Sequence, residues 1–407
     1  MKIPYGLSNF RDIITQGYVY VDKTLYIERL ENSGKYQLLL RPRRFGKSLL
    51  LSTLWHYYDI YYRDEFATLF GHLYIGQQPT PLHNRYQVLF MEFSGIDTDA
   101  GFDNIYHGFN RKVANALQSF LERYAYPAAS IQAITAEPTP QSRMETFFRI
   151  VAEQKLVILI DEYDHFANAL LSEDLTLFQR MMSKGGFVRS FYETLKTATL
   201  TGVLDRLFIT GVTPIMLDSM TSGFNIAENL SLHPDFNEAV GFTKAEVQQL
   251  LAPITVEQPS KLLADITQWY NGYCFNTYQQ QTLYNANMVL YFLKNYRQMD
   301  NSYPDPMLDE NIASDYGKIL KLFSIGNRDN NFSVLNELIN TGEVTALQRR
   351  KFDFDKGFDR DDFISLLAYI GFVTLRRKTL RSEVFSIPNY AIRELYDYYL
   401  PMASELK

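Results

Sequence analysis

The stretch from Leu38 to Leu51 restricts the fold more than any other part of this 407-residue chain. It reads L-L-L-R-P-R-R-F-G-K-S-L-L-L, and its first three leucines predict a short buried strand. The aliphatic residues after Gly-Lys-Ser continue with helical spacing to Trp55. A strand, a tight loop, Gly-Lys-Ser and a helix form the layout of a phosphate-binding loop, in which backbone N–H groups surround an anion.

In such a loop the lysine reaches the terminal phosphates and the next hydroxyl binds Mg²⁺. These roles fall to Lys47 and Ser48. Arg41 stands where the pattern G-x-x-x-x-G-K-[ST] has its first glycine, and Arg41-Pro42 lacks that glycine's backbone freedom. The loop alone therefore leaves a solvated basic turn open as the alternative. The residues that we expect around the phosphates are Arg43, Arg44, Phe45, Gly46, Lys47, Ser48 and Leu49.

A second motif lies far downstream, where residues 155–164 read K-L-V-I-L-I-D-E-Y-D. The five apolar residues from Leu156 to Ile160 predict a strand buried on both faces of a parallel sheet. Two acids follow at its carboxyl end, where open α/β sheets bind their ligands. We expect Asp161 to hold Mg²⁺ and Glu162 to polarise the attacking water, and a strand that ends in a polar turn is the alternative. The two motifs in this order predict a P-loop NTPase.

Strands and helices alternate between and after these motifs. Residues 87–93 predict a second parallel strand, residues 102–124 a long helix, and Leu207–Ile209 a further core strand. Ser142, three residues before Glu145, predicts a capped helix start that leads to the acidic strand. This alternation predicts a doubly wound α/β domain with a parallel sheet.

Further candidate site residues lie near these strands. Thr210 ends one of them, where its hydroxyl can contact the γ-phosphate or the attacking water, although a plain strand end is an equal alternative. Arg206 precedes that strand and faces away from this nucleotide, so it could act as an arginine finger only across a subunit boundary, in a homo-oligomer. Tyr20, Asp22 and Lys23 are candidates to contact the nucleotide base, and an edge strand is the alternative for their segment.

Composition excludes several classes of protein. The net charge of −6 argues against a protein that coats nucleic acid over its whole surface, but it leaves a local basic patch open. Cys274 is the single cysteine, which rules out an internal disulfide and fits a reducing compartment. The absence of a signal peptide and of a membrane-spanning apolar run predicts a cytoplasmic protein. No metal-ligand spacing surrounds His165 or His233, so we expect no zinc site.

The pattern changes twice along the chain, which predicts a core over residues 1–240, a helical lid over 241–300 and a C-terminal part over 301–407. Thr243 and Glu246 form a capping box at the start of the lid. Residues 299–311 look like a linker, with Asp300, Pro304, Asp305 and Pro306. The aromatic run Trp269-Tyr270-Asn271-Gly272-Tyr273 is better explained by packing than by chemistry.

The C-terminal part predicts a helix over Asp361–Ile370, a hairpin over Gly371–Ile387 and a helix from Tyr390 to Tyr399. This order suggests a winged-helix-like region. The hairpin carries basic side chains that could contact nucleic-acid phosphates, and a solvated hairpin tip is the alternative. The basic residues are Arg376, Arg377, Lys378 and Arg381.

Taken together, these motifs resemble the bacterial AAA-ATPase-like family, which is similar to archaeal STAND-type ATPases. The residues that carry the resemblance are Tyr20–Thr24, residues 41–48, residues 159–164, Thr210–Val212, Gly241–Thr243 with Glu246, Trp269–Tyr273 and Ile387–Tyr390. The resemblance implies that arginine at position 41 is a family trait. It also implies an ATP-binding core, a helical lid and a winged-helix-like region.

Longer members of that family carry a C-terminal PD-(D/E)XK nuclease-like domain, which would begin shortly after Ile387–Tyr390. No acidic pair followed by Glu-x-Lys occurs there, so nuclease activity is unsupported if the sequence is complete and stays open if the natural chain continues past Lys407. We therefore expect a switch that binds and hydrolyses ATP with Mg²⁺ and couples nucleotide state to a partner protein or nucleic acid. The alternatives are a non-hydrolysing module that presents a winged helix to DNA or protein, and the ATPase part of a nuclease effector.

Overall fold

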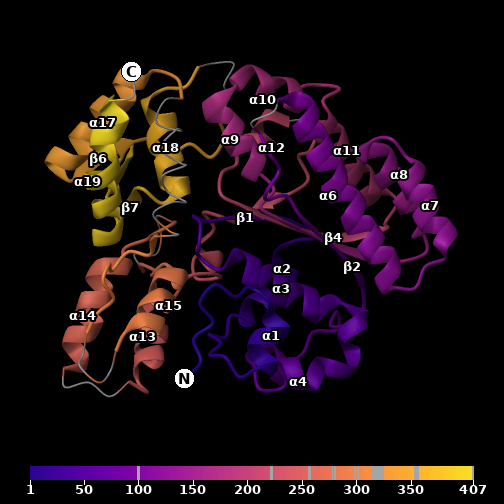
Figure 1. Cartoon of the computed structure of the whole chain (residues 1–407), viewed down its shortest axis with the longest axis horizontal. Helices are drawn as coiled ribbons and strands as arrows, with labels where there is room; N and C mark the ends of the chain where they lie inside the picture. The colour runs from indigo at the N-terminus through magenta and orange to yellow at the C-terminus, as the bar shows by residue number, and fades with distance from the viewer. Residues whose placement is uncertain are drawn as a thin grey trace.

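A parallel five-stranded sheet forms the centre of the N-terminal part of the molecule (Figure 1). The computed structural model describes residues 1–98, 101–220, 223–254, 258–276, 278, 281–297, 299, 302–310, 312, 325–352 and 357–405. The strand order is β2-β3-β4-β1-β5. The strands are β1 (Tyr36–Leu40), β2 (Gln87–Glu92), β3 (Leu156–Asp161), β4 (Leu204–Gly211) and β5 (Glu228–Asn229).

Helices cover both faces of this sheet, which confirms the expected α/β fold class. Every residue of β3 is buried, as the continuous apolar run predicted. Helix α3 packs on one face, and α6 and α11 pack on the other (Figure 1). The helices of this part are α1 (Phe10–Thr15), α2 (Leu25–Ser33), α3 (Lys47–Tyr58), α4 (Phe66–Phe70), α5 (Tyr74–Gln77), α6 (Phe102–Arg123), α7 (Ala128–Ala136), α8 (Pro140–Ile150), α9 (His165–Glu173), α10 (Leu175–Met182), α11 (Phe187–Leu200) and α12 (Ile215–Met220), with 3-10 turns at Ile60–Glu65 and Pro234–Phe236.

The register of the sheet brings the two sequence motifs to one edge. Glu92 at the end of β2 lies opposite Asp161 at the end of β3, and Leu40 at the end of β1 lies opposite Gly211 at the end of β4. Because β4 lies between β1 and β3, the loop after β1 and the acidic turn after β3 emerge on either side of it. The carboxyl edge of the sheet is therefore the place to look for a ligand site.

Two local expectations and one alternative differ from the structure. Thr139, not Ser142, caps α8: the Thr139 hydroxyl accepts from the Ser142 N–H at 3.0 Å, and Pro140 takes the first helical position, where proline is favoured. Strand β4 begins at Leu204, so Arg206 lies within it and not before it. Residues 17–24, all of them described, add no strand to the five-stranded sheet.

Helices dominate the part that follows the core, as expected. They are α13 (Lys244–Leu251), α14 (Pro259–Tyr270) and α15 (Ala286–Asn295), at the lower left of Figure 1. The predicted capping box of Thr243 and Glu246 is present at the start of α13. The expected linker packs against these helices: Tyr303 contacts Phe292, and the Tyr270 hydroxyl donates to the Met307 carbonyl at 2.7 Å. Asp300 lies outside the described residues.

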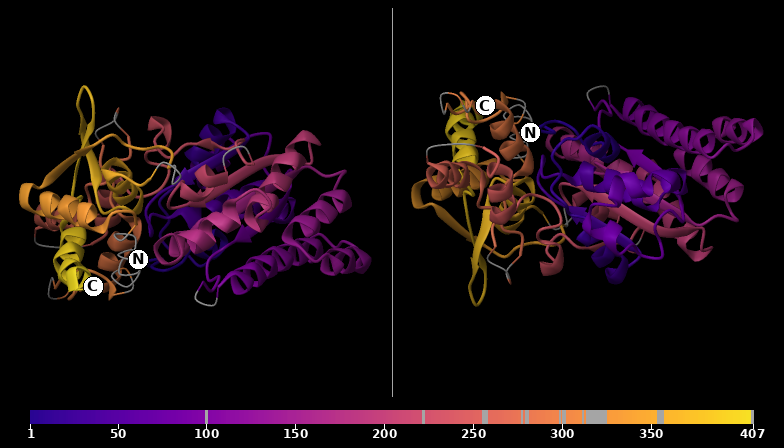
Figure 2. Two further views of the ribbon diagram at one scale, coloured as in Figure 1. Left: turned by 90° about the horizontal axis from the view of Figure 1, so that it is seen from above. Right: turned by 90° about the horizontal axis from the view of Figure 1, so that it is seen from below.

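The C-terminal part combines helices with a three-stranded antiparallel sheet of order β6-β8-β7. The expected helix, hairpin and final helix are all present, and Figure 2 shows the hairpin projecting from this part of the molecule. Its description as a winged helix stays a prediction. The elements are α17 (Arg328–Thr341), β6 (Glu343–Ala346), α18 (Arg360–Ile370), β7 (Thr374–Lys378), β8 (Glu383–Ser386) and α19 (Tyr390–Glu405). Among the described residues, no helix is both long and apolar enough to cross a membrane.

Candidate nucleotide-binding site

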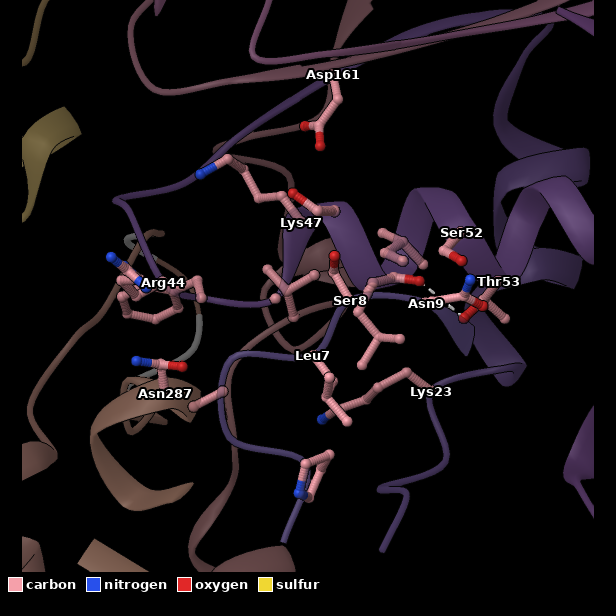
Figure 3. A pocket seen from close by; sticks show the side chains of 18 of the residues that line it. Leu7, Ser8, Asn9, Lys23, Arg44, Lys47, Ser52, Thr53, Asp161 and Asn287 are labelled. Atoms are coloured by element: carbon pink, nitrogen blue, oxygen red, sulfur yellow. Dashed lines mark hydrogen bonds between the residues drawn. The ribbon is translucent and has the colours of Figure 1, made fainter. Parts of the chain in front are cut away.

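A cavity of about 870 Å³ opens at the carboxyl edge of the parallel sheet. Its walls come from parts of the N-terminal segment, the loop after β1 with the start of α3, the ends of β2 and β3, and residues within 239–242 and 286–290, most of them in the predicted lid. Figure 3 shows Lys47 and Asp161 on one side of it and Lys23, Arg44 and Asn287 on the other. The lining residues on which the argument below depends are Tyr20, Lys23, Arg43, Arg44, Phe45, Gly46, Lys47, Ser48, Leu49, Glu92, Asp161, Glu162, His165 and Asn287.

The loop between β1 and α3 has the backbone shape of an anion cradle. Arg44 has φ +68° and Gly46 has φ +102°, so the chain enters the left-handed region twice within three residues. Such alternation turns successive N–H groups toward one point. Gly46 is also the N-cap of α3 and gives it no side-chain hydrogen bond, so the first N–H groups of that helix have no intrahelical acceptor. The loop therefore presents backbone donors to an anion at the positive end of α3.

Lys47 is folded back on its own loop. Its side chain is buried, and its Nζ donates to the carbonyls of Arg41 at 3.0 Å and Pro42 at 3.1 Å. Burial lowers the pKa of Lys47, while the carboxylates of Glu162 and Asp161 oppose that shift. A phosphate group in the cavity would compete with these two carbonyls for the same ammonium group.

Asp161 is held by hydroxyl groups from two other elements. The Thr210 hydroxyl donates to its Oδ1 at 2.5 Å, and the Ser48 hydroxyl also bonds to its carboxylate. Burial raises the pKa of Asp161, and these two hydrogen bonds work against that rise. A serine hydroxyl beside a carboxylate fits Mg²⁺, which takes few protein oxygens and completes its shell with phosphate and water. The described residues contain no cluster of three or more His, Cys, Asp or Glu that could hold a metal ion.

Glu162 adopts an unusual backbone conformation for its residue type. Its φ is +51°, in the left-handed region, which costs a non-glycine residue on the order of 1 kcal/mol. Its N–H donates to Asp161 Oδ1 at 3.0 Å, and its carbonyl accepts from the His165 N–H at 3.1 Å. These bonds hold the turn, and Glu162 lines the cavity close to Lys47.

Arg41 explains why the first glycine of the loop pattern is dispensable here. Its guanidinium is buried outside the cavity, where Nη1 donates to the carbonyls of Leu40 and Ser231 at 2.8 and 2.7 Å. Its Nη2 donates to those of Phe236 and Asn237 at 2.9 and 3.4 Å. A solvated basic turn is therefore the wrong description for Arg41, because its side chain is part of the core.

The N-terminal segment contributes only part of the expected base contact. Tyr20 and Lys23 line the cavity, and Lys23 forms an ion pair with Glu246 of the lid at 2.6 Å. Asp22 does not line it. The Asp22 carboxylate accepts from the N–H and hydroxyl of Thr24 at 2.8 and 2.6 Å, and from the Tyr74 N–H at 2.7 Å. These nearby donors occupy its carboxylate, and its contact with the base stays a prediction.

Other predicted residues lie away from the cavity. Thr210 is fully buried and contacts Asp161 but does not line the cavity. Arg206 donates to the Gly34 carbonyl at 3.3 Å, at the opposite end of its strand. In the hairpin, Arg377 forms a bidentate pair with Glu343, and Arg376 donates to Ser386. Lys378 and Arg381 are exposed.

Sequence reasoning missed several lining residues. His165 was considered only as a metal ligand, yet it lines the cavity one turn after Glu162. Glu92 ends β2, and its place near the end of the strand predicted over residues 87–93 was a usable signal because neighbouring parallel strands end at one edge. Asn287 and residues 4–9 carry no motif that could have placed them there.

A parallel sheet of this order, with an anion-cradling loop after β1 and an acidic pair after β3, defines a P-loop NTPase fold. Residues 4–221, more than half of the chain, match the family described as "Predicted AAA-ATPase", and the chain belongs to this family. The family and the fold support ATPase-like nucleotide binding.

The chain is also similar to one curated relative in sequence and to solved structures. The chain is 26% identical over 312 residues to the "Uncharacterized protein in vnfD 5'region" of Azotobacter chroococcum mcd 1, covering 72% of this chain and 52% of that protein. It thus spans about half the length of this curated relative. Its structure is similar to a Walker-type ATPase of Pyrococcus abyssi, with a TM-score of 0.52 and 10% identity over 92% of this chain and 94% of that one. The ORC1 protein of Aeropyrum pernix in complex with DNA matches with a TM-score of 0.36 and 11% identity over 98% of both chains.

Proposed function

We propose that this chain binds ATP with Mg²⁺ in the cavity and hydrolyses it to ADP and phosphate. One observation carries the proposal: Lys47 and Ser48 from one stretch of sequence, and Asp161 and Glu162 from another, line a single cavity at the carboxyl edge of the sheet. An anion cradle, a lysine and an acidic pair are the parts that phosphoryl transfer to water requires.

The loop residues bind the triphosphate in this proposal. The N–H groups at the start of α3 donate to phosphate oxygens, and Lys47 exchanges its two carbonyl acceptors for them. Arg43 and Arg44 line the same space and add positive charge. Tyr20 and Lys23 lie on the wall that the N-terminal segment contributes, which suits the base and ribose.

Ser48 and Asp161 would hold Mg²⁺, which neutralises charge on the phosphates when bound. Glu162 polarises a water molecule whose oxygen forms a bond to the γ-phosphorus, while the bond from that phosphorus to the bridging oxygen of ADP breaks. The proton released by the water passes through Glu162 to solvent. Thr210 fixes the orientation of Asp161 through its hydroxyl bond.

Nucleotide state can reach the lid through the loop itself. The Phe45 carbonyl accepts from the Gly241 N–H at 2.8 Å, and the Arg44 carbonyl accepts from the Asn287 N–H at 3.2 Å. The Arg43 carbonyl accepts from Asn285 Nδ2 at 3.2 Å. A phosphate that repositions these peptides from the cavity side also moves the carbonyls that the lid contacts, and this coupling would make the ATPase a switch.

A second candidate is a non-hydrolysing module that presents the C-terminal hairpin to DNA or to a protein. The exposed tip favours it, since Leu380 is fully exposed between the exposed Lys378 and Arg381. The ion pair of Arg377 with Glu343 weakens it, because that arginine is already neutralised. The relative's greater length also suits an ATPase part of a larger protein.

Two measurements test these candidates: the affinity for ATP with Mg²⁺, and phosphate release with and without DNA. We expect Lys47→Ala to weaken ATP binding about 100-fold, and Glu162→Gln to keep binding while turnover falls at least about 100-fold. Lys184→Ala, at an exposed lysine, is the matched control and should behave like the wild type. ATP binding without turnover in the wild type would favour the module, and failure to bind ATP would overturn both candidates.

A further inference from the structure

Two residues that line the cavity each carry a buried side-chain nitrogen with no hydrogen-bond partner in the described part of the chain. These nitrogens are Nδ1 of His165 and Nδ2 of Asn287. Buried polar atoms in folded proteins nearly always find a partner, because an unsatisfied one costs about 1–3 kcal/mol. A bound molecule or water could supply the partner that each of these two atoms lacks. Asn287 lies on the lid beside Arg44 (Figure 3), whereas His165 belongs to the acidic turn.

The backbone fixes His165 next to Glu162. The bond from the His165 N–H to the Glu162 carbonyl closes a turn between them, and both side chains line the cavity. Asp164 stands between them in the sequence but turns into the core, where it accepts from the N–H groups of Val212 and Thr213. His165 and Glu162 are thus the two side chains that this turn offers to the cavity.

The groups around the ring favour its neutral form. Burial lowers the pKa of His165, and the cation of Arg43 on the loop lowers it further. The carboxylates of Glu162 and Asp164 on its own turn, and of Glu92 at the end of β2, act in the opposite direction. A neutral imidazole has one nitrogen that accepts and one that donates, so it can accept a hydrogen bond from water.

We propose that His165 Nδ1 accepts a hydrogen bond from the attacking water, beside the bond that Glu162 accepts from the same water. The inference rests on the proposed hydrolysis of ATP. A water molecule whose two hydrogens are both held by fixed acceptors directs a lone pair away from them, toward the terminal phosphorus. Orientation of this kind lowers the barrier by limiting the water's freedom before reaction. His165 then acts directly on the reacting oxygen, which makes it a catalytic residue alongside Glu162.

Three substitutions separate a water contact from a packing role. His165→Asn places an amide oxygen near the position of Nδ1, His165→Gln places it about one bond further out, and His165→Leu removes it. We expect kcat to fall about 10- to 100-fold in the leucine variant and to be higher in the asparagine variant than in the glutamine variant, with the affinity for ATP within about threefold of wild type throughout. Equal turnover of the leucine variant and the wild type would overturn the inference, and so would equal losses in all three variants.

A second readout does not depend on turnover. In ¹⁵N-histidine-labelled Glu162→Gln protein, the Nδ1 resonance of His165 should shift on addition of ATP with Mg²⁺ but not of ADP with Mg²⁺, because only ATP retains the terminal phosphate that the water faces. His56 is the internal control: it lines the same cavity, but its Nδ1 is already bonded to the Ser52 carbonyl at 2.7 Å, so its resonance should stay. An unmoved His165 resonance would contradict the proposal even if a variant misfolds.

A wild type that binds but does not hydrolyse ATP would remove the proposed function together with this inference, whereas an active wild type with an equally active leucine variant would remove only the inference.

Discussion

Replacement of Arg41 by glycine would restore the loop pattern that phosphate-binding loops usually have, yet we expect it to destabilise this protein. The guanidinium of Arg41 bonds to four carbonyl oxygens of the core, three of them at 2.7–2.9 Å. Its substitution leaves these carbonyls without that donor in a buried region. The loop motif alone predicts that Arg41→Gly is tolerated, whereas the packing of the guanidinium predicts that it destabilises the protein.

The size of the effect follows from these contacts. Each of the three carbonyls at short distance loses about 1 kcal/mol, and the glycine backbone costs up to about 1 kcal/mol more. We therefore expect the free energy of unfolding of the core to fall by about 4 kcal/mol. Loss of the cation–π contact between Arg41 and Phe275 at 4.2 Å acts in the same direction.

Arg44→Gly is the matched control because it makes the same exchange three residues later. Arg44 has φ +68°, a conformation that glycine adopts at no steric cost, so this variant should stay within about 1 kcal/mol of wild type. The chain has two tryptophans, and a Trp269→Phe background leaves Trp55 on α3 as the fluorescent reporter of the core during denaturant unfolding. If Arg41→Gly and Arg44→Gly unfold at the same denaturant concentration, the reasoning about the buried guanidinium is refuted.

Three further predictions follow from named contacts. Thr210→Val should lower kcat about tenfold with little change in ATP affinity, because it removes the hydroxyl that donates to Asp161; unchanged phosphate release would contradict this. A double-mutant cycle with Lys23→Met and Glu246→Gln should give a coupling energy of about 1–3 kcal/mol in denaturant unfolding, and additive effects would show that the pair contributes nothing. Burial raises the pKa of Asp218 from 3.8 to about 7, so the native carboxyl keeps a proton that the unfolded chain releases, and wild-type stability should fall as the pH rises from about 4 to 7. Asp218→Asn removes that dependence. The Tm of the variant should therefore rise relative to that of the wild type between pH 5 and pH 8, and a Tm difference that does not change with pH would contradict the prediction.

Much of the fold was predictable because β1, β2, β3 and β4 contain short apolar runs that are followed by polar or glycine residues, whereas β5 (Glu228–Asn229) has no such run. The run before Asp161 is buried along its whole length, and burial on both faces of a sheet requires such a run. The loop after β1 could also be predicted, since Gly-Lys-Ser between a strand and a helix is typical of a phosphate-binding loop. Both motifs consist of residues that are close in sequence, so local patterns describe them well.

The contacts that sequence could not supply join distant residues. Arg41 was taken as a possible part of a basic turn because nothing near it in sequence reveals the carbonyls of Ser231 and Phe236, which lie about 190 residues away along the chain. The sequence did not reveal the partners of Asp22 either: its carboxylate accepts hydrogen bonds from Thr24 and from Tyr74, which lies about 50 residues away along the chain. The hydrogen-bond partners of a polar side chain in a folded core depend on which groups the topology brings near it. These partners can be named only once the topology is known.

The buried arginine and the loop geometry together explain how an anion site can work without its first glycine. That glycine normally gives a loop the freedom to adopt a tight conformation. In this protein, packing contacts from other parts of the chain help to fix the loop conformation. Pro42 packs so closely on Gly371 that a Cβ there would lie 2.8 Å from the proline ring, and the Phe45 ring packs edge-on against Tyr273 at 4.9 Å. Because residues of the lid and the C-terminal part form these contacts, they help to define the loop conformation. Under the proposed function, the affinity of the loop for phosphate and the placement of those parts are thermodynamically linked, so a change in one alters the other.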